Sequence, residues 1–276
     1  MKNISNKEWL SLTVNLNKEY NIDSLYQHFY NYIIGTTEKD SKLIFYFEKD
    51  NQHIINKLIT NQLESYKLKI KNIKYENWHN TYEEYFKPIN INNNLMIVPE
   101  WYKIQDNSME YIRIIPGMAF GTGTHETTQL IISNLENYIY KGCTVLDLGS
   151  GSGILSIAAL KYGASEITAV EYDRDCKDNF LENFQLNNIS NNYTLLFKDV
   201  LSFKNYSYDF IIANINKNII LELLPRIKKY RTNQSKIILS GLLVNDRNDV
   251  INVIKKLKFN LLEEFIKGEW ICFIID

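Results

Sequence analysis

Short apolar runs and amphipathic segments alternate along the second half of the chain. The apolar runs have the length and composition of buried parallel strands, and they cover residues 144–148, 167–170, 193–197, 209–213 and 236–239. Between them, apolar residues recur three or four positions apart and predict helices over 154–160, 174–187, 218–230 and 246–257. This alternation predicts a doubly wound α/β domain with a parallel sheet.

The last two apolar runs break this pattern. Residues 260–266 and 269–275 are separated only by Lys267 and Gly268, which is too short a connection for a helical crossover. The two strands must therefore pair antiparallel. Together with the five parallel strands, they predict a seven-stranded sheet that ends in an antiparallel hairpin.

Three glycines directly follow the first of the parallel strands. Gly149, Gly151 and Gly153 lie between that strand and the first helix, where the absence of a Cβ atom lets the backbone turn tightly and approach a ligand. Glu171 ends the next strand about 20 residues later, a position suited to accept hydrogen bonds from ribose hydroxyls. The sequence therefore predicts a ligand that carries a nucleoside.

Two nucleoside cofactors compete for this turn, a nicotinamide dinucleotide and S-adenosylmethionine. The dinucleotide motif Gly-x-Gly-x-x-Gly places pyrophosphate at a helix N-terminus, but Ile154 occupies the position of its third glycine here. Asp147 stands two residues before the first glycine. A carboxylate there repels pyrophosphate and suits a cofactor with an ammonium and a sulfonium group, which favours S-adenosylmethionine.

The first third of the chain predicts a separate, smaller unit. Strands are predicted over residues 9–14 and 43–47, and apolar side chains at helical spacing predict helices that include 25–33 and 54–63. Sheet and helices together make a small two-layer module. It holds no cluster of catalytic residue types, so we expect it to bind or position a substrate.

These patterns predict three parts. A small α+β substrate-recognition domain covers residues 1–66, and a linker with an aromatic helix from Trp78 to Pro88 covers residues 67–90. The α/β domain covers residues 91–276.

A loop rich in glycine and threonine lies near the start of the α/β domain. Two short strands over 95–98 and 111–115, which we expect to pair, precede it, and it runs from residue 116 to 128. So much backbone freedom combined with so many hydroxyl groups indicates contact with a ligand. Thr124 is also placed to cap the following helix, with Thr127 in its first turn, but capping alone does not require the glycines.

Composition argues against several classes of protein. The 276 residues carry a formal net charge of −1, which argues against a broad nucleic-acid-binding surface, and 45% of them are hydrophobic. The three cysteines are far apart, so neither a disulfide framework nor a metal site is indicated. The N-terminus lacks the apolar core of a signal peptide, and no run approaches the roughly 18 apolar residues of a membrane span. We expect a soluble, cytoplasmic monomer.

The glycine-containing segments carry a resemblance to a known family. They read Pro-Gly-Met-Ala-Phe-Gly-Thr-Gly-Thr-His-Glu-Thr-Thr from residue 116, Val-Leu-Asp-Leu-Gly-Ser-Gly-Ser-Gly from residue 145, Ala-Asn-Ile from residue 213 and Ser-Gly-Leu-Leu from residue 240. With these motifs the sequence resembles the PrmA family, which methylates a large-subunit ribosomal protein, the eleventh by the usual naming. The resemblance implies the fold of class I S-adenosylmethionine-dependent methyltransferases, a Rossmann-like seven-stranded sheet with an antiparallel C-terminal hairpin.

The resemblance also implies site residues and a substrate. Cofactor contacts carry over to Thr127, Gly149, Glu171 and Asn214. The implied reaction is repeated methylation of lysine side chains and of an N-terminal amine. The implied partner is a ribosomal protein of the large subunit, free or on the ribosome, with no sequence-specific contact to nucleic acid and none to a membrane.

Four further residues are cofactor-binding candidates from their positions alone. Gly151 lets the backbone lie against the methionine part of the cofactor, and Phe120 covers that part. Tyr172 follows the acidic strand end and is placed to pack on adenine. Asp199 follows the third parallel strand, where it either accepts from the adenine amine or caps a turn, and the sequence leaves both open.

Methylation of an amine is an in-line displacement, so alignment carries much of the barrier reduction. A free lysine, with a pKa of about 10.4, must first be desolvated or deprotonated. Asn214 is the catalytic candidate, because its side-chain carbonyl can accept a hydrogen bond from the attacking nitrogen. For His125 the sequence leaves two roles open, a catalytic base or a residue that packs at the start of the helix. The segment after Asn214 lacks the two prolines typical of glutamine and adenine methyltransferases. This argues against glutamine or adenine as the substrate.

Three other functions stay open at this stage. The first is a class I methyltransferase of another protein or of a small amine. The second is a ribosome assembly factor that binds the cofactor without catalysis. The third is a nicotinamide oxidoreductase.

Overall fold

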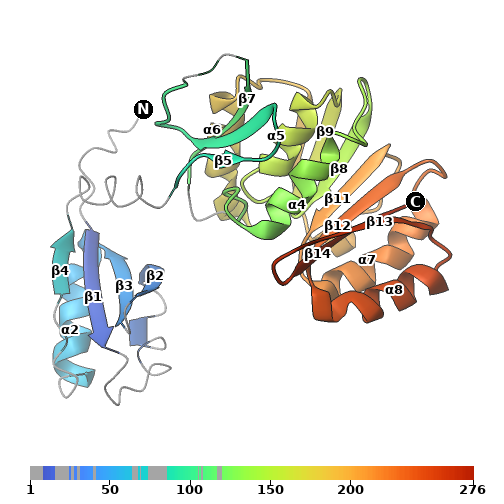
Figure 1. The fold of residues 1–276 in the computed structure, drawn as a ribbon. Helices are drawn as coiled ribbons and strands as arrows, with labels where there is room; N and C mark the ends of the chain where they lie inside the picture. Colours follow the sequence, from blue (N-terminus) through green and yellow to red (C-terminus); the bar gives the residue numbers. More distant parts are fainter. Residues whose placement is uncertain are drawn as a thin grey trace. The chain divides into compact units, whose positions relative to one another are not determined.

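The computed structural model describes residues 9–15, 25, 28–29, 32–39, 42–63, 68, 70–73, 86–104, 106, 108–116 and 120–276. The chain divides into two compact units, Met1–Tyr85 and Phe86–Asp276 (Figure 1). Within the described ranges, no helix combines the length and the apolar character needed to cross a membrane.

The first unit contains a four-stranded antiparallel sheet and a helix. Its strands are β1 (Trp9–Asn15), β2 (Ile33–Lys39), β3 (Lys42–Glu48) and β4 (Ile70–Ile73), in the order β2-β3-β1-β4. A short 3-10 turn, η2 (Lys49–Asn51), leads into α2 (Gln52–Gln62). Alternate residues of β1 and β3 are buried, so one face of the sheet carries a core of its own.

Two strands of this unit differ from the sequence prediction. The sequence places Ile33 on a helical face, but Ile33 begins β2, where β-branched residue types favour a strand and β3 supplies the hydrogen bonds. β4 lies inside the predicted linker and pairs with β1, so the sheet extends beyond residue 66. The predicted aromatic helix lies outside the described residues as far as Tyr85.

The second unit is built on the predicted seven-stranded sheet. Its strands are β8 (Thr144–Leu148), β9 (Glu166–Glu171), β10 (Tyr193–Phe197), β11 (Phe210–Asn214), β12 (Lys236–Leu243), β13 (Leu261–Lys267) and β14 (Trp270–Ile275). They lie in the order β10-β9-β8-β11-β12-β14-β13. The first five are parallel, and β14 pairs antiparallel with both β12 and β13. The predicted sheet and its closing hairpin are therefore confirmed.

Helices cover both faces of this sheet (Figure 1). One face packs against α4 (Glu126–Leu135), α5 (Ile154–Lys161) and α6 (Lys177–Leu186), and the other packs against α7 (Lys217–Tyr230) and α8 (Arg247–Lys256). Short 3-10 turns precede helices or follow strands at η4 (Arg174–Cys176), η5 (Val200–Ser202) and η6 (Val244–Asp246). Neighbouring residues of the parallel strands belong to opposite cores, as Val145 and Leu146 do in β8. Burial on both faces explains why the parallel strands are continuous apolar runs.

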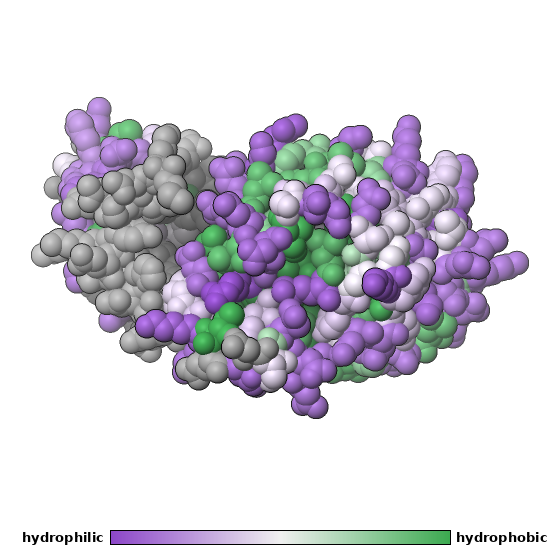
Figure 2. Space-filling model, turned by 90° about the horizontal axis from the view of Figure 1, so that it is seen from above, coloured by the Kyte–Doolittle hydropathy of each residue, from purple (hydrophilic) through white to green (hydrophobic). Residues whose placement is uncertain are grey.

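Hydrophilic residues cover much of the described surface seen in Figure 2, with hydrophobic areas between them. Among the large hydrophobic side chains that remain exposed are Phe120, at 54%, and Tyr172, at 78%. Both are residues for which the sequence predicts cofactor contact. Their exposure leaves the two rings accessible to a ligand.

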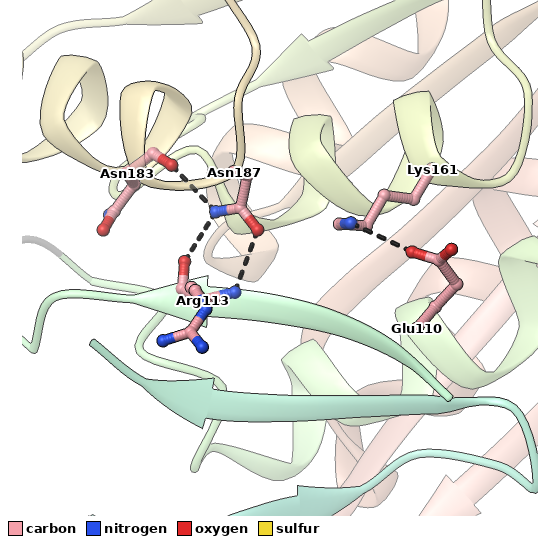
Figure 3. A network of polar contacts seen from close by, with 5 residues as sticks. All are labelled: Glu110, Arg113, Lys161, Asn183 and Asn187. Atoms are coloured by element: carbon pink, nitrogen blue, oxygen red, sulfur yellow. Dashed lines mark hydrogen bonds and ion pairs between the residues drawn. The ribbon is translucent and has the colours of Figure 1, made fainter. Parts of the chain in front are cut away.

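A small sheet precedes α4. It consists of β5 (Ile89–Asn90), β6 (Leu95–Pro99) and β7 (Glu110–Ile114), and the predicted pairing of the last two is confirmed as parallel. Two helices of the main domain dock on β7 (Figure 3). The Asn187 side chain bonds to the backbone of Arg113, and Lys161 forms a 3.1 Å ion pair with Glu110. The end of β7 is thereby fixed beside α6, and the threonine-rich loop (residues 116–125) begins there.

Candidate cofactor-binding site

Three of the predicted site residues lie level with one another at one edge of the main sheet. In the register of the parallel strands, Leu148 of β8 lies opposite Val170 of β9, and the last pair between β8 and β11 is Leu148 with Ala213. Gly149, Glu171 and Asn214 each follow these residues directly. The structure therefore brings the glycine turn, the acidic strand end and the asparagine together at the carboxyl edge, where open α/β sheets bind ligands.

The protein itself occupies the space beside the first two glycines of the turn. Gly149 and Gly151 have φ values of +79° and +50°, in the left-handed region that favours glycine. A Cβ atom on Gly149 would lie 2.5 Å from the Cγ2 atom of Ile215, and one on Gly151 would lie 2.5 Å from the carbonyl oxygen of Phe120. Internal packing thus requires both glycines, and their contact with a cofactor stays a prediction.

Backbone amides fix the Glu171 carboxylate in place. Its Oε2 atom accepts from the Gly151 N–H at 2.8 Å, and its Oε1 atom accepts from the N–H groups of Tyr172 and Asp173 at 2.8 and 2.9 Å. A carboxylate offers about four acceptor positions, so capacity remains for a ribose hydroxyl. The carboxylate is therefore positioned in advance of any ligand.

Buried polar atoms without a partner cluster at the same edge. Among the residues that the structure describes, the buried side-chain atoms with no hydrogen-bond partner include Asp147 Oδ1, Ser150 Oγ and Asn214 Oδ1. These atoms belong to β8, the glycine turn and the end of β11. Buried polar groups are nearly always hydrogen-bonded, so these three indicate a site that receives donors from a ligand. S-adenosylmethionine, which carries an ammonium and an amine group, fits this set.

The Asp147 carboxyl is completely buried, and burial raises its pKa to about 6. The Ser156 hydroxyl donates to its Oδ2 atom at 2.6 Å, which lowers the pKa, whereas the nearby charge of Glu171 raises it. A cation bound close by would favour the charged form. This residue therefore suits a positively charged ligand, as the sequence indicates.

His125, rather than Thr124, caps the helix after the threonine-rich loop. The Nδ1 atom of His125 accepts from the N–H of Thr127 at 3.3 Å, so the prediction of a Thr124 cap is wrong. The Thr127 hydroxyl lies 2.7 Å from the same Nδ1 atom, and Thr127 is fully buried. A ring nitrogen serves here as the cap because the chain enters α4 in an extended conformation at residue 125.

The His125 ring packs in an aromatic cluster at the edge of the site. Its centroid lies 5.3 Å from that of Phe120 and 4.7 Å from that of Trp270. Because Nδ1 accepts a hydrogen bond, the neutral ring carries its proton on Nε2. This favours packing over general-base catalysis for His125.

The residues after Asn214 fit tightly against β12. The Nδ2 atom of Asn214 donates to the Thr128 hydroxyl at 3.5 Å, and the N–H of Ile215 donates to the Ser240 carbonyl at 3.2 Å. Gly241 has a φ of +81°, and a Cβ atom there would press against the backbone of Ile215. The Ser-Gly pair of β12 therefore determines where Asn214 and Ile215 lie.

Asp199 and Tyr172 lie at neighbouring strand ends. The Asp199 side chain accepts from the Leu201 N–H at 2.9 Å and caps η5, which is one of its two predicted roles. The N–H of Lys198 bonds to the Glu171 carbonyl at 2.8 Å, so Asp199 stands beside the acidic strand end. Adenine contacts for Asp199 and Tyr172 stay predictions.

Sequence reasoning missed two groups of residues at this site. Ser150 is buried without a partner in the described chain, although a serine between glycines carries no distinctive signal. Asn179, Asn183 and Asn187 lie four residues apart on α6, and their amides bond to β7, the residue after it and the glycine turn. That spacing is visible in the sequence and indicates a shared helical face.

Comparisons with known proteins agree with this geometry. The sequence matches the family described as "Ribosomal protein L11 methyltransferase (PrmA)" over residues 7–276. It is 36% identical over 202 residues to a ribosomal protein L11 methyltransferase of Acetivibrio thermocellus, an alignment that covers 72% of this chain and 64% of that protein. The chain thus spans slightly less than two thirds of the length of this relative.

A solved structure is also similar to this chain. It is a ribosomal protein L11 methylase from Lactobacillus delbrueckii subsp. bulgaricus, with 33% sequence identity and a TM-score of 0.65, and the match covers 69% of this chain and 98% of the other. The seven-stranded sheet is therefore the class I methyltransferase fold. The chain belongs to the PrmA family of ribosomal protein L11 methyltransferases, a family that depends on S-adenosylmethionine.

Proposed function

We propose that this protein transfers methyl groups from S-adenosyl-L-methionine to lysine side-chain and N-terminal amines of ribosomal protein L11. The observation that carries the proposal is the carboxamide oxygen of Asn214, which is buried and has no hydrogen-bond partner among the described residues. It lies at the carboxyl edge of the sheet, level with Gly149 and Glu171. Membership of the PrmA family supports the choice of substrate.

In this proposal, each residue of the site has a separate role in the reaction. S-adenosylmethionine, when bound, supplies an electrophilic methyl group on a sulfonium sulfur. Glu171 holds the nucleoside through the ribose hydroxyls, and Thr127 binds the amino-acid part. The Asn214 oxygen accepts from the attacking amine and aligns its lone pair, while burial disfavours the ammonium form of the amine. Phe120 shields the site from water.

The other parts of the chain have supporting roles in this proposal. We assign substrate recognition to residues 1–66, connection to residues 67–90 and methyl transfer to residues 91–276. The first unit has a hydrophobic core of its own, as a separate recognition domain requires. All three cysteines are free, which suits a reducing compartment, so we place a monomeric enzyme in the cytoplasm.

Intact-mass analysis of ribosomal protein L11 tests this function. We expect the mass of L11 to rise in steps of one methyl group after incubation with this protein and S-adenosylmethionine. Calorimetry with S-adenosylmethionine and with NADH checks the cofactor, and only the first should bind. Binding without any gain of methyl groups would contradict catalysis on L11, and binding of NADH alone would contradict the cofactor as well.

A further inference from the structure

One residue of the glycine turn, Ser152, bonds directly to the middle of the threonine-rich loop and is linked through Asn183 to the residue before the loop. The Ser152 N–H donates to the Phe120 carbonyl at 2.9 Å, and the Ser152 hydroxyl donates to the Gly121 carbonyl at 2.5 Å. The Asn183 amide in turn donates to the Ser152 carbonyl at 2.9 Å and accepts from the N–H of Ile115, the residue before the loop, at 2.8 Å. Residues 115, 120 and 121 are therefore all held, directly or through Asn183, to Ser152.

Backbone meets backbone where the loop touches the turn. A Cβ atom on Gly151 would lie 2.5 Å from the Phe120 carbonyl oxygen, and one on Gly121 would lie 3.0 Å from the Ser152 hydroxyl. Ser152 and Asn183 are both fully buried. Hydrogen bonds in such a position are shielded from water and hold their geometry closely.

The simpler explanation of the asparagines is that they dock α6 on β7. It accounts for Asn187, whose side chain accepts from the Arg113 N–H at 2.9 Å and donates to the Arg113 carbonyl at 2.6 Å (Figure 3). It also accounts for Asn179, which donates to the Ile115 carbonyl at 3.0 Å. It does not account for Asn183, because the amide of Asn183 donates past β7 to the glycine turn.

We propose that Asn183 and Ser152 are positioning residues that hold the threonine-rich loop on the glycine turn and thereby set the affinity for S-adenosylmethionine. This inference rests on the proposed function of the site. Phe120 lies where the loop bonds to Ser152, and Thr127 lies just beyond the loop in α4. A loop that is already ordered costs the ligand less conformational entropy on binding, so loosening the loop raises the Kd.

Asn183→Ala and Asn187→Ala form a matched pair of variants. Asn183→Ala removes two hydrogen bonds, to the Ile115 N–H and the Ser152 carbonyl, and Asn187→Ala removes two to the backbone of Arg113 and one to the Asn183 carbonyl. Only the first variant breaks the link to Ser152. We expect similar decreases in Tm. By calorimetry, we expect the Kd for S-adenosylmethionine to rise about tenfold in Asn183→Ala and to change less than twofold in Asn187→Ala. Hydrogen exchange of residues 120–126 without cofactor should accelerate only in Asn183→Ala.

Equal Kd values in the two variants, or equal exchange of residues 120–126, would overturn the inference. If Asn183→Ala does not fold, Ser152→Ala replaces it. This change deletes the hydroxyl bond to the Gly121 carbonyl and a long bond from the Ile154 N–H, and it should raise both the Kd and the loop exchange. Failure of the unaltered protein to bind S-adenosylmethionine would refute the proposed function and the effect on affinity together. In that case the exchange experiment still decides whether Asn183 fastens the loop.

Discussion

A carboxylate at each end of the paired strands β8 and β11 shows a contrast: the half-buried Asp209 is fully hydrogen-bonded within the protein, and the fully buried Asp147 is not. At the amino end, Asp209 accepts from the N–H and hydroxyl of Thr144 at 2.8 and 2.9 Å. Burial alone would raise the pKa of Asp209, but these bonds and one from Tyr140 bring it below its usual value. At the carboxyl end, Asp147 has one oxygen without a partner in the described chain, and burial raises its pKa to about 6.

Two buried serines repeat this contrast. Ser235, before β12, donates to the Tyr208 carbonyl at 2.6 Å, whereas Ser150 in the glycine turn has no partner among the described residues. Polar groups at the amino edge are satisfied within the protein and stabilise it. At the carboxyl edge, Asp147 Oδ1, Ser150 Oγ and Asn214 Oδ1 have no partner among the described residues, and we expect a ligand to satisfy them.

The largest difference should be between the kcat values of the Asn214→Ala and Ser235→Ala variants. We expect Asn214→Ala to lower kcat for methyl transfer about 100- to 1,000-fold, because the acceptor that aligns the amine is lost, as when a donor is removed from an oxyanion hole. Ser235→Ala should lower the free energy of unfolding by about 1 kcal/mol and leave kcat unchanged. Steady-state kinetics and urea unfolding of both variants measure the two quantities.

Cofactor binding supplies the control for Asn214→Ala. The variant should still bind S-adenosylmethionine measurably, since Glu171 and Thr127 remain. Equal losses of kcat in the Asn214 and Ser235 variants would erase the distinction between the two edges.

The two aspartates should respond to neutralisation with opposite signs. At pH 7, Asp147→Asn should raise the free energy of unfolding by up to about 3 kcal/mol, because the folded pKa of about 6 lies above the usual 3.8. A raised carboxyl pKa means that the folded state binds the proton more tightly, so stability falls as pH rises from 3.8 towards 6. The gain from Asp147→Asn should therefore shrink to about half at pH 5. Urea unfolding at both pH values measures this.

Asp209→Asn should instead destabilise the protein at pH 7, by about 1 kcal/mol. The lowered pKa of Asp209 contributes stability above its unfolded pKa, and this stability is lost as pH falls through the folded pKa. Asp147→Asn should also weaken binding of the cationic cofactor, whereas Asp209→Asn should not. A stabilising Asp209→Asn, or an Asp147→Asn variant that binds the cofactor more tightly, would contradict the assignment of the two edges.

The two edges of the sheet also differ in how tightly the protein packs around a glycine with a left-handed backbone. Gly142, before β8, has a φ of +95° and open space where a Cβ atom would lie, while Gly241 of β12 has a φ of +81° and lies against the Ile215 backbone. Gly142→Ala should cost about 1 kcal/mol from backbone strain alone. Gly241→Ala should lower the free energy of unfolding by about 2 kcal/mol. It should also lower kcat, because a Cβ atom at residue 241 would displace Ile215 and, with it, the neighbouring Asn214.

Thermal unfolding and methyl-transfer assays of the two alanine variants measure these effects. An equally active Gly241→Ala variant would show that β12 does not position Asn214.

The sequence predicts the main sheet well because its central strands, such as β8, β11 and β12, are buried on both faces and are therefore largely apolar runs. It predicts the first unit less well. β2 and β4 are short or edge strands whose formation depends on pairing with β3 and β1, which leaves no local pattern. Ile33 also lies at helical spacing from Phe29 by coincidence, and this produced the wrong element.

At the site, the sequence predicts which residues gather but not what they contact. Gly149, Glu171 and Asn214 meet because parallel strands end at one edge, a rule that needs no coordinates. The packing of Gly151 against Phe120 and the hydrogen bond from Asn183 to Ser152 join segments far apart in the sequence. Only tertiary structure reveals contacts of this kind.

The smallest difference should be between the cofactor affinities of alanine variants at two exposed tyrosines. Tyr172, at the carboxyl edge, is 78% exposed, and Tyr230, at the end of α7, is 48% exposed. We expect Tyr172→Ala to weaken S-adenosylmethionine binding by about 1 kcal/mol, roughly fivefold in Kd, because a base that stacks on an aromatic ring loses about that much. Tyr230→Ala should leave the Kd unchanged, and neither change should alter Tm by more than a few degrees. Calorimetry measures the Kd of both variants. An unaltered Kd in Tyr172→Ala would contradict the prediction that Tyr172 packs on adenine.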